Sequence, residues 1–362
     1  MATPATRSGE RAWRARAAAA VLAAALAAWA PVAPGGPAPA QPPGGAALRR
    51  TAPAFGGVAA VEVRGLPPAA AAAAVAAAFE EIGEIERLTA PAAGGDPPAA
   101  GGVAALVAGA PARVDPRLAR LLERARSFCR WSKGAHGPLG GRLYRLWGVG
   151  GAPAGAASGG RPTPAALAAA VESARCERLA VDPATATVTL PEGSVVDLTG
   201  FAAGFAADRA ADALRAAGAA NGVLEVGTVV RAFGPGPEGA GWPVELPAFP
   251  GTDGPLRLLL RDQAVAVAAG GARPIVIAGD RHAGFLDQRT GRPAEGVVAT
   301  AAAAELGIDA EALAVASFVL GSREATFLLG ALKPAPAVLW LLGTGAGRPL
   351  LTSHHWSQLA TF

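Results

Sequence analysis

The feature that most constrains this chain is a series of short apolar segments separated by Gly- and Pro-rich turns. Such segments, bounded by turn residues, are typical of strands. They cover residues 177–181, 187–190, 195–198, 223–226, 229–233, 242–246, 256–260, 264–268, 275–278 and 284–287. Helices do not alternate with them, so a doubly wound parallel sheet is not predicted. The sequence therefore predicts an α+β fold, with mostly antiparallel sheets and packed helices.

Single helices are predicted between these strand clusters. Asp115 and Pro116 supply an N-cap and a first helical residue for a helix that ends at Gly134. The other predicted helices cover 68–88, 164–173, 201–217, 310–320 and 322–329, and further strands are predicted at 58–63 and 337–342. No repeat with a fixed period is present.

Composition excludes several classes of protein. Gly 48 and Pro 32 among 362 residues would suit a disordered chain, but the hydrophobic fraction of 51% and mean hydropathy of +0.32 indicate a folded core. The net charge is +4 and the arginines are scattered, so a nucleic-acid surface is not predicted. Coiled coil, collagen and polytopic membrane protein are also excluded.

The amino terminus has the pattern of a secretory signal. Four arginines between Arg7 and Arg16 precede an apolar run over 17–30, and Ala38-Pro39-Ala40 follows. As a helix the run is ~21 Å long, short of a ~30 Å hydrocarbon core. We expect a signal peptide over 1–40, export to the periplasm and no stable membrane span after cleavage; a retained Ala-rich anchor helix is the alternative.

The remaining chain is expected to form one unit. A flexible lead-in is predicted over 41–52, a single domain over 53–345 and a tail over 346–362. Export makes Cys129 and Cys176 candidates for a disulfide. Two buried thiols are the alternative, because the sequence does not give the distance between their Cα atoms.

Two segments carry the pattern of a site. In residues 196–208 a strand, a tight turn at Gly200 and a helix start follow one another, and N–H groups at a helix start can hold a phosphate. Residues 285–293 end a strand in a polar turn with an acid, two arginines and a hydroxyl. The alternatives are an ordinary strand–helix turn and a solvated Asx turn. The four histidines do not form a zinc pattern.

The order of these motifs resembles the ApbE-type flavin transferases, the FAD:protein FMN transferase family. The resemblance covers roughly 55–330 and depends on the shared order of the motifs. Its matching positions are Asp115-Pro116, Gly134-Ala135, Gly137-Pro138-Leu139, Leu146-Trp147-Gly148, Asp197 to Asp208, Gly227 with Arg231, Asp287 with Arg289-Thr290-Gly291 and Pro293, Ala310 to Ala316, and Gly321.

The resemblance implies an activity and a set of site residues. Family members bind FAD with Mg²⁺, split its pyrophosphate and place FMN on a Thr of an acceptor protein. The implied catalytic residues are Asp287 and, as a stand-in, His282. The implied cofactor-binding residues are Gly200, Gly204, Asp208, Gly227, Gly270, Arg289, Thr290 and Gly291, and the implied metal ligands are Glu311 and the Gly200 carbonyl.

The sequence departs from the family at polar positions. Ala203 replaces a lysine, Gly284 a histidine and Val315 a metal-ligating threonine, while Ala268-Ala269-Gly270-Gly271 and Gly227-Thr228-Val229 replace two polar stretches. A cation beside a pyrophosphate offsets its charge, and alanine cannot. We therefore expect FMN transfer to be weakened or lost. The alternatives are a working transferase with a rearranged site, a non-catalytic relative that binds FAD or a partner protein, and a structural protein.

A further segment, Asp182 to Thr185, faintly resembles the acceptor pattern that such enzymes modify. We interpret it as a plain turn between two strands.

Overall fold

The computed structural model describes residues 47–91, 99–149, 161–246, 254–271, 274–277, 280–343, 350–359 and 361. The predicted signal peptide and the first part of the lead-in lie outside these residues. The α+β class predicted from the sequence is confirmed, because mainly antiparallel sheets pack against helices.

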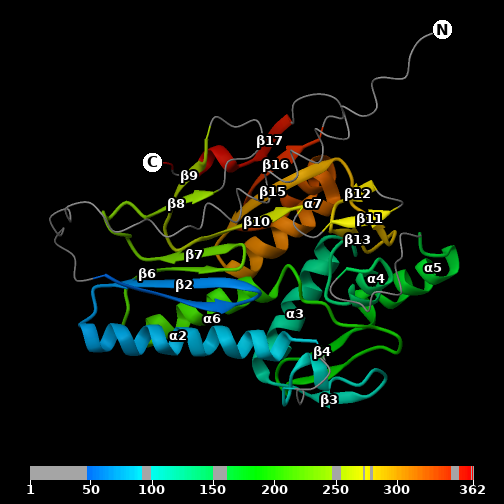
Figure 1. Cartoon of the computed structure of the whole chain (residues 1–362), viewed down its shortest axis with the longest axis horizontal. Helices are drawn as coiled ribbons and strands as arrows, with labels where there is room; N and C mark the ends of the chain where they lie inside the picture. The colour runs from blue at the N-terminus through cyan, green and yellow to red at the C-terminus, as the bar shows by residue number, and fades with distance from the viewer. Residues whose placement is uncertain are drawn as a thin grey trace, which may run out of the picture.

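An eight-stranded antiparallel sheet forms the centre of the molecule (Figure 1). Its order is β1-β2-β6-β7-β10-β15-β16-β17. The strands are β1 (Leu48–Ala54), β2 (Gly57–Arg64), β6 (Asn221–Val226), β7 (Val229–Phe233), β10 (Ala264–Ala269), β15 (Val297–Ala304), β16 (Ala337–Leu342) and β17 (Leu350–His354). The middle of this sheet is alanine-rich. Because alanine side chains are short, helices can approach the sheet closely.

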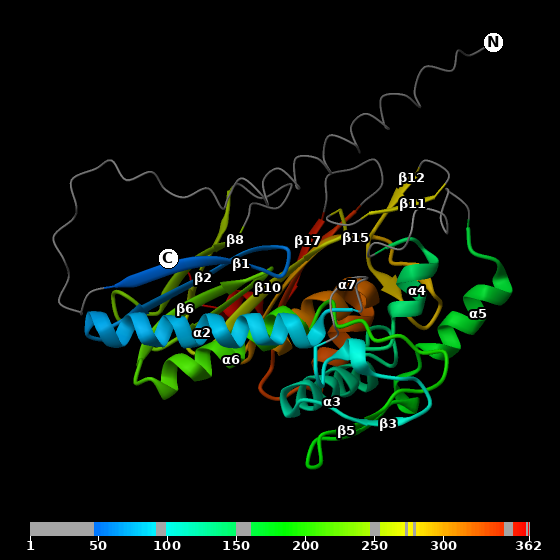
Figure 2. The same ribbon diagram turned by 60° about the horizontal axis from the view of Figure 1, so that its bottom comes forward.

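Three helices cover one face of the sheet, as Figure 2 shows: α2 (Pro68–Thr89), α6 (Ala202–Ala216) and α7 (Gly307–Leu329). The hairpin of β8 (Trp242–Leu246) and β9 (Leu256–Leu260) covers part of the other face with Trp242 and Leu260. Strand β10 is in contact with both neighbouring layers, since Ala266 packs on the helix side and Val265 on the hairpin side. This alternation is that of a strand buried on both faces.

Helix α7 is, within the described residues, the one helix long and apolar enough to cross a membrane. Most of its side chains are buried, including Phe318 and Leu329. Thr300 of β15 donates its hydroxyl to the Ala314 carbonyl at 2.7 Å, which fixes α7 against the sheet. The helix therefore has the burial of a core helix.

A second group of elements lies beside the sheet. Helix α3 (Pro116–Trp131) packs on the small sheet of β3 (Pro111–Arg113), β5 (Thr187–Thr189) and β4 (Ala180–Asp182). Beyond it lie α4 (Gly141–Leu146), α5 (Pro164–Ser173) and the hairpins β11 (Ile275–Ile277)–β12 (Asp280–His282) and β13 (Leu286–Asp287)–β14 (Arg292–Pro293). Short 3-10 turns occur at η1 (Val103–Ala105), η2 (Cys176–Arg178) and η3 (Trp356–Gln358).

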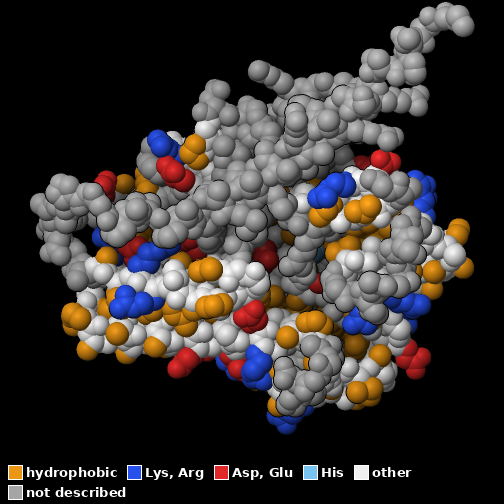
Figure 3. All heavy atoms as spheres, viewed as in Figure 1, with side chains coloured by type: hydrophobic (Ala, Val, Ile, Leu, Met, Phe, Trp, Pro, Cys, Tyr) orange, Lys and Arg blue, Asp and Glu red, His pale blue; other side chains and the backbone are white. Residues whose placement is uncertain are grey.

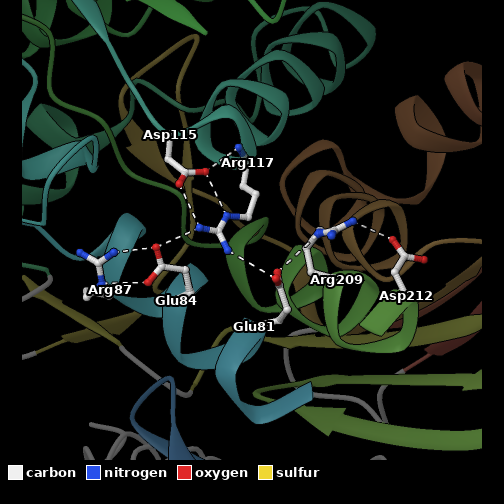
Figure 4. Close-up of polar contacts among 7 residues, drawn as sticks. All are labelled: Glu81, Glu84, Arg87, Asp115, Arg117, Arg209 and Asp212. Atoms are coloured by element: carbon white, nitrogen blue, oxygen red, sulfur yellow. Dashed lines mark hydrogen bonds and ion pairs between the residues drawn. The ribbon is translucent and has the colours of Figure 1, made fainter. Parts of the chain in front are cut away.

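Ion pairs connect α2, α3 and α6 at their surface (Figure 4). The Arg117 guanidinium lies 3.0 Å from carboxylate oxygens of both Asp115 and Glu84, and 3.4 Å from Glu81. Arg209 of α6 lies 3.6 Å from Glu81. Partly exposed pairs of this kind contribute little individually, so the network orients the helices more than it stabilises them.

Several predicted elements differ in the structure. Residues 48–52 of the predicted lead-in belong to β1, where Arg49 donates to Glu225 at 2.9 Å, and residues 350–354 of the predicted tail form β17. Strand β15 was not predicted, because an alanine run carries no strand pattern. Residues 195–198 are not a strand but form one bridge, from Val195 to Gly140. Helix α4 was not predicted from the sequence.

Cys129 and Cys176 form a disulfide with a Cα–Cα distance of 6.3 Å. Of the two alternatives left by the sequence, the structure has the bonded one. The Asp182 to Thr185 segment is the predicted turn: Asp182 accepts from the Ala184 N–H at 3.0 Å and from the Thr185 hydroxyl at 2.7 Å.

Candidate functional site

The glycine turn before α6 is closely packed on two sides. Gly200 has a φ of +87°, which favours glycine, and the Asp197 carboxylate accepts from the Thr199 N–H at 2.8 Å. A Cβ at Gly200 would lie 2.8 Å from Nε2 of His136 and 3.0 Å from a methyl of Val315. The turn predicted from the sequence is thus present, and a histidine and α7 fill the space against it.

Glu311 binds the first turn of α6. Its Oε2 accepts from the Gly204 N–H at 2.7 Å, and the residue is buried. Gly204 itself is in contact with the start of α7, because a Cβ there would lie 2.3 Å from the Gly307 carbonyl oxygen. At least one N–H of the helix start therefore binds a carboxylate of the chain itself, although the sequence pattern would also have allowed a phosphate there.

Asp208 performs the reverse role for α7. Its carboxylate accepts from the Gly307 N–H at 2.7 Å and the Ile308 N–H at 3.0 Å, the first two residues of that helix. The Arg231 guanidinium also donates to it at 3.1 Å. The residue was predicted to bind a cofactor, and its contacts in the structure are those of a helix cap.

Burial shifts the pKa of both carboxyl groups upward. It raises the pKa of Asp208 to about 6, against the opposing effects of the two N–H donors and Arg231. It raises the pKa of Glu311 to about 7, against the Gly204 N–H, and the charge of Asp208 adds to the increase. For Arg231, burial lowers the pKa in spite of Asp208. Burial thus outweighs pairing throughout this junction.

His136 is a site residue that was not predicted from the sequence. Its ring stacks on Phe201, with a centroid distance of 4.5 Å and an interplanar angle of 2°. Neither ring nitrogen makes a hydrogen bond of good geometry, and Nε2 lies beside the Gly200 backbone. Burial lowers the pKa of His136 to about 3, with the Gly200 backbone acting in the opposite direction, so the ring is neutral at physiological pH. Its place between Ala135 and Gly137, two positions of the resemblance, was the available indication.

Hydrogen bonds and ion pairs hold the turn after β13 at both ends. Asp287 accepts from the Arg289 backbone N–H at 2.9 Å and pairs with its guanidinium at 2.8 Å, while Arg289 pairs with Glu324 of α7 at 2.7 Å. The Thr290 N–H donates to the Asp287 carbonyl at 3.1 Å. Trp147 donates to the Gly291 carbonyl at 2.6 Å. The predicted polar turn after this strand is therefore itself an Asx turn, so the two interpretations of the sequence describe the same residues.

Gln288 anchors this turn and was also missed. Its backbone N–H donates to the Ala135 carbonyl at 3.1 Å, and its side chain donates to the Gly137 carbonyl at 2.9 Å. The stretch 134–141 thus contacts the 287–291 turn on one side. On the other, the Asp197 N–H donates to the Pro138 carbonyl at 2.9 Å.

The predicted elements therefore converge. The Gly200 turn contacts His136 and α7, and the 287–291 turn contacts both Ala135 and α7. Figure 3 shows a hollow in this face of the molecule, between the α2 side and the α4–α5 side. The Gly200 turn, Asp287 and Glu311 are therefore linked by contacts through His136, Gln288 and α7.

The remaining predicted residues lie at different distances from this centre. Gly227, with a φ of +58°, faces Ala203, whose Cβ would lie 3.2 Å from a Cβ at Gly227. Gly270 accepts a hydrogen bond from the Gly284 N–H at 3.0 Å and packs on Phe318. His282 pairs with Ile275 in the β11–β12 hairpin. Its contacts given by the register are thus with β11.

The donors at this junction do not fit a Mg²⁺ site. Mg²⁺ requires several hard oxygen ligands in octahedral geometry. One oxygen of Glu311 is engaged by Gly204, Val315 offers no oxygen, and the space against Gly200 holds Val315 and the His136 ring. Within the part of the chain that the structure describes, no group of three or more His, Cys, Asp or Glu residues could hold a metal.

The fold and site define an α+β protein in which a glycine turn at a helix start meets a strand-end acidic turn. The model of the ApbE family matches residues 59–339, most of the chain. The chain belongs to the ApbE family.

Curated relatives and solved structures agree with this assignment. The FAD:protein FMN transferase of Treponema pallidum is 32% identical over 239 residues, covering 61% of this chain and 64% of the relative. That of Haemophilus influenzae is 28% identical over 224 residues, covering 59% and 63%. The chain thus spans less than two thirds of each of these relatives.

Two solved structures share the fold. The apo form of the flavinyl transferase ApbE of Pseudomonas stutzeri superposes with a TM-score of 0.70 at 21% identity, covering 86% of this chain and 95% of that one. The ApbE protein of Thermotoga maritima gives a TM-score of 0.70 at 24% identity, covering 84% and 97%.

Proposed function

We propose that this chain is an exported FAD-binding member of the ApbE family in which FMN transfer to a threonine of an acceptor protein is weak or lost. The observation that carries the proposal is the occupation of the α6–α7 junction by the chain's own side chains. Glu311 is hydrogen-bonded to Gly204, and Val315 and His136 pack on Gly200.

The reaction of the family explains why this matters. The acceptor hydroxyl attacks the FMN phosphorus, the pyrophosphate bond breaks, AMP leaves with the bridging oxygen, and the hydroxyl proton passes to a base. The developing negative charge needs a cation or preorganised donors, which together contribute several kcal/mol. Here Ala203 and Val315 supply neither, and Asp287 already holds Arg289.

FAD binding is supported by what remains. The glycine turn at Gly200, the facing turn at Gly227 and the 287–291 turn are all present, with a positive φ at Gly200, Gly227 and Gly291. The curated relatives are named FAD:protein FMN transferases, which supports FAD as the ligand. A flavin-acceptor protein is the corresponding partner if transfer persists.

Export is proposed on two observations. The arginines before the apolar run over 17–30 have the pattern of a secretory signal. The disulfide between Cys129 and Cys176 suits an oxidising compartment such as the periplasm.

The test is to incubate the purified chain with FAD, Mg²⁺ and a flavin-acceptor domain, and to measure the mass of the acceptor. An active ApbE transferase is the positive control. We expect FAD to co-purify or to bind in calorimetry while the acceptor gains no FMN. Stoichiometric FMN on a threonine of the acceptor would favour the alternative, a working transferase with a rearranged site. Absence of FAD binding would reject the proposal.

A further inference from the structure

The disulfide lies next to the glycine-rich stretch 134–141, which contacts both turns of the site. Cys129 is in the last turn of α3 and Cys176 is the first residue of η2, 47 positions later, and both are fully buried. The loop closed by this bond contains the glycine-rich stretch 134–141 together with α4 and α5. The cross-link therefore fixes both ends of the segment that carries the stretch 134–141.

The Cys129 sulfur is in contact with Gly137. A Cβ at Gly137 would lie 2.6 Å from Sγ and 2.7 Å from Cβ of Cys129, closer than real Cβ atoms approach. Because no side chain fits between them, the position of Gly137 follows the position of the sulfur. The Gly134 N–H also donates to the Cys129 carbonyl at 2.8 Å, which fixes the start of the same stretch.

Gly137 in turn holds Gln288. The Gly137 carbonyl accepts from Nε2 of Gln288 at 2.9 Å, and a Cβ at Gly140 would lie 2.5 Å from that same nitrogen. The Gln288 backbone donates to the Ala135 carbonyl at 3.1 Å. Gln288 is thus held by three residues of the stretch that the disulfide closes, two through its buried side chain and one through its backbone.

Gln288 lies between the two residues of the strand-end ion pair. Asp287 and Arg289 pair at 2.8 Å, and Arg289 reaches Glu324 of α7 at 2.7 Å. A displacement of Gln288 therefore displaces the Asp287–Arg289 pair. The contacts form an unbroken series from the disulfide, through Gly137 and Gln288, to the predicted flavin site.

We propose that the Cys129–Cys176 disulfide positions the 287–291 turn through Gly137 and Gln288, so that flavin binding depends on the redox state of the two cysteines. The flavin part rests on the proposed function. In the reduction step one thiolate of a dithiol attacks the Cys129–Cys176 bond, which gives a mixed disulfide and one free cysteine, and its second thiolate then attacks the mixed disulfide and releases the other cysteine. The two sulfurs of the dithiol become joined, the Cys129–Cys176 bond breaks, and each cysteine gains one proton and one electron.

Hydrogen exchange tests the positioning without any flavin. The Gln288 backbone N–H, which donates to Ala135, is measured in the full chain before and after reduction with dithiothreitol. We expect its exchange to become at least about tenfold faster, while the amides of α6 keep their rates. Unchanged exchange at Gln288 in protein with two titratable thiols would overturn the proposal.

FAD titration tests the functional consequence. In buffers with graded ratios of reduced to oxidised dithiothreitol, we expect the FAD dissociation constant to rise at least about fivefold, at the same ratio at which two thiols appear, and to recover on reoxidation. Faster exchange with an unchanged dissociation constant would overturn the flavin part. If FAD binds neither form, the proposed function fails, and the exchange result decides the positioning alone.

Variants separate the effect of the cross-link on exchange and FAD affinity from the effects of packing and of unfolding. Cys176→Ser leaves the Cys129 sulfur against Gly137 but removes the bond, and we expect it to behave as the reduced protein in oxidising buffer. Gln288→Leu keeps the disulfide and removes the anchor, so it decides the question if reduction unfolds the chain; normal exchange and FAD affinity in this variant would contradict the proposal. Glu177→Gln, beside Cys176 and exposed, is the matched control and should leave both measurements unchanged.

Discussion

Asp208 on α6 and Glu311 on α7 each cap the helix that carries the other. Asp208 accepts from the first two N–H groups of α7, and Glu311 accepts from the Gly204 N–H in the first turn of α6. The two helices touch at Gly204 and Gly307, where neither has room for a side chain. This reciprocal capping orients the helix pair on which the Gly200 turn stands.

The buried charge of Glu311 makes stability depend on pH. Its folded pKa of about 7 lies above the ordinary value of 4.5 for a glutamate, so its contribution to stability is full at acidic pH and is lost as pH rises through about 7. Glu311→Gln keeps an acceptor for Gly204 without the charge. We expect this variant to match the wild type in urea unfolding near about pH 5 and to exceed it by about 1–3 kcal/mol near about pH 8. A wild-type advantage at the higher pH would contradict this.

Asp208 should be far less tolerant of neutralisation. Asp208→Asn leaves the nearly buried Arg231 guanidinium without its carboxylate, and breaking a buried pair costs about 3–5 kcal/mol. Asp212→Asn on the same helix removes an exposed partner of Arg209 and should cost less than about 1 kcal/mol. The midpoints of chemical unfolding compare the two, and equal losses would show that the buried Arg231 does not depend on the charge of Asp208.

The contact between α6 and α7 can be tested with a methyl group. Gly204→Ala places a Cβ against the Gly307 backbone and should destabilise the chain by about 2–3 kcal/mol. Gly83→Ala, on an open face of α2, meets nothing within 4 Å and should stabilise by about 0.5–1 kcal/mol. Thermal unfolding of both variants gives the comparison, in which opposite signs are the expected result.

His136 should make the chain sensitive to acid. Its folded pKa of about 3 lies below the ordinary value of 6.5 for a histidine, so the stability linked to it is present above about pH 6.5 and falls as pH decreases. His136→Phe removes both ring nitrogens, neither of which makes a hydrogen bond of good geometry, and keeps the stack on Phe201. We expect the variant to gain about 2 kcal/mol over the wild type between about pH 6.5 and pH 5. A constant difference across this range would contradict a neutral, buried histidine.

Much of the fold could be predicted from local pattern. Strands such as β7 and β8 are bounded by turn residues and were predicted at their observed limits, and Gly321 divides α7 where the sequence indicates, with a φ of +71°. Strand β15 could not be predicted, because its alanines are fixed by pairing with β10 and β16 rather than by propensity.

The site was predictable in position but not in role. The glycine turn and the Asp287 turn are local motifs, so their sequences identify them. The cap between Glu311 and Gly204 joins residues 107 positions apart, and the burial of His136 depends on Phe201 and α7. Contacts of this kind arise only from tertiary packing, and residue type alone does not distinguish a capping carboxylate from a metal ligand.

The measurement that tests the account most directly is a calorimetric titration of the chain with FAD, in the presence and absence of Mg²⁺. We predict that FAD binds. Because the chain's own side chains fill the α6–α7 junction, we also predict that the FAD dissociation constant changes by less than about twofold when Mg²⁺ is added. Binding that requires Mg²⁺, or that Mg²⁺ strengthens by about tenfold or more, would contradict the account.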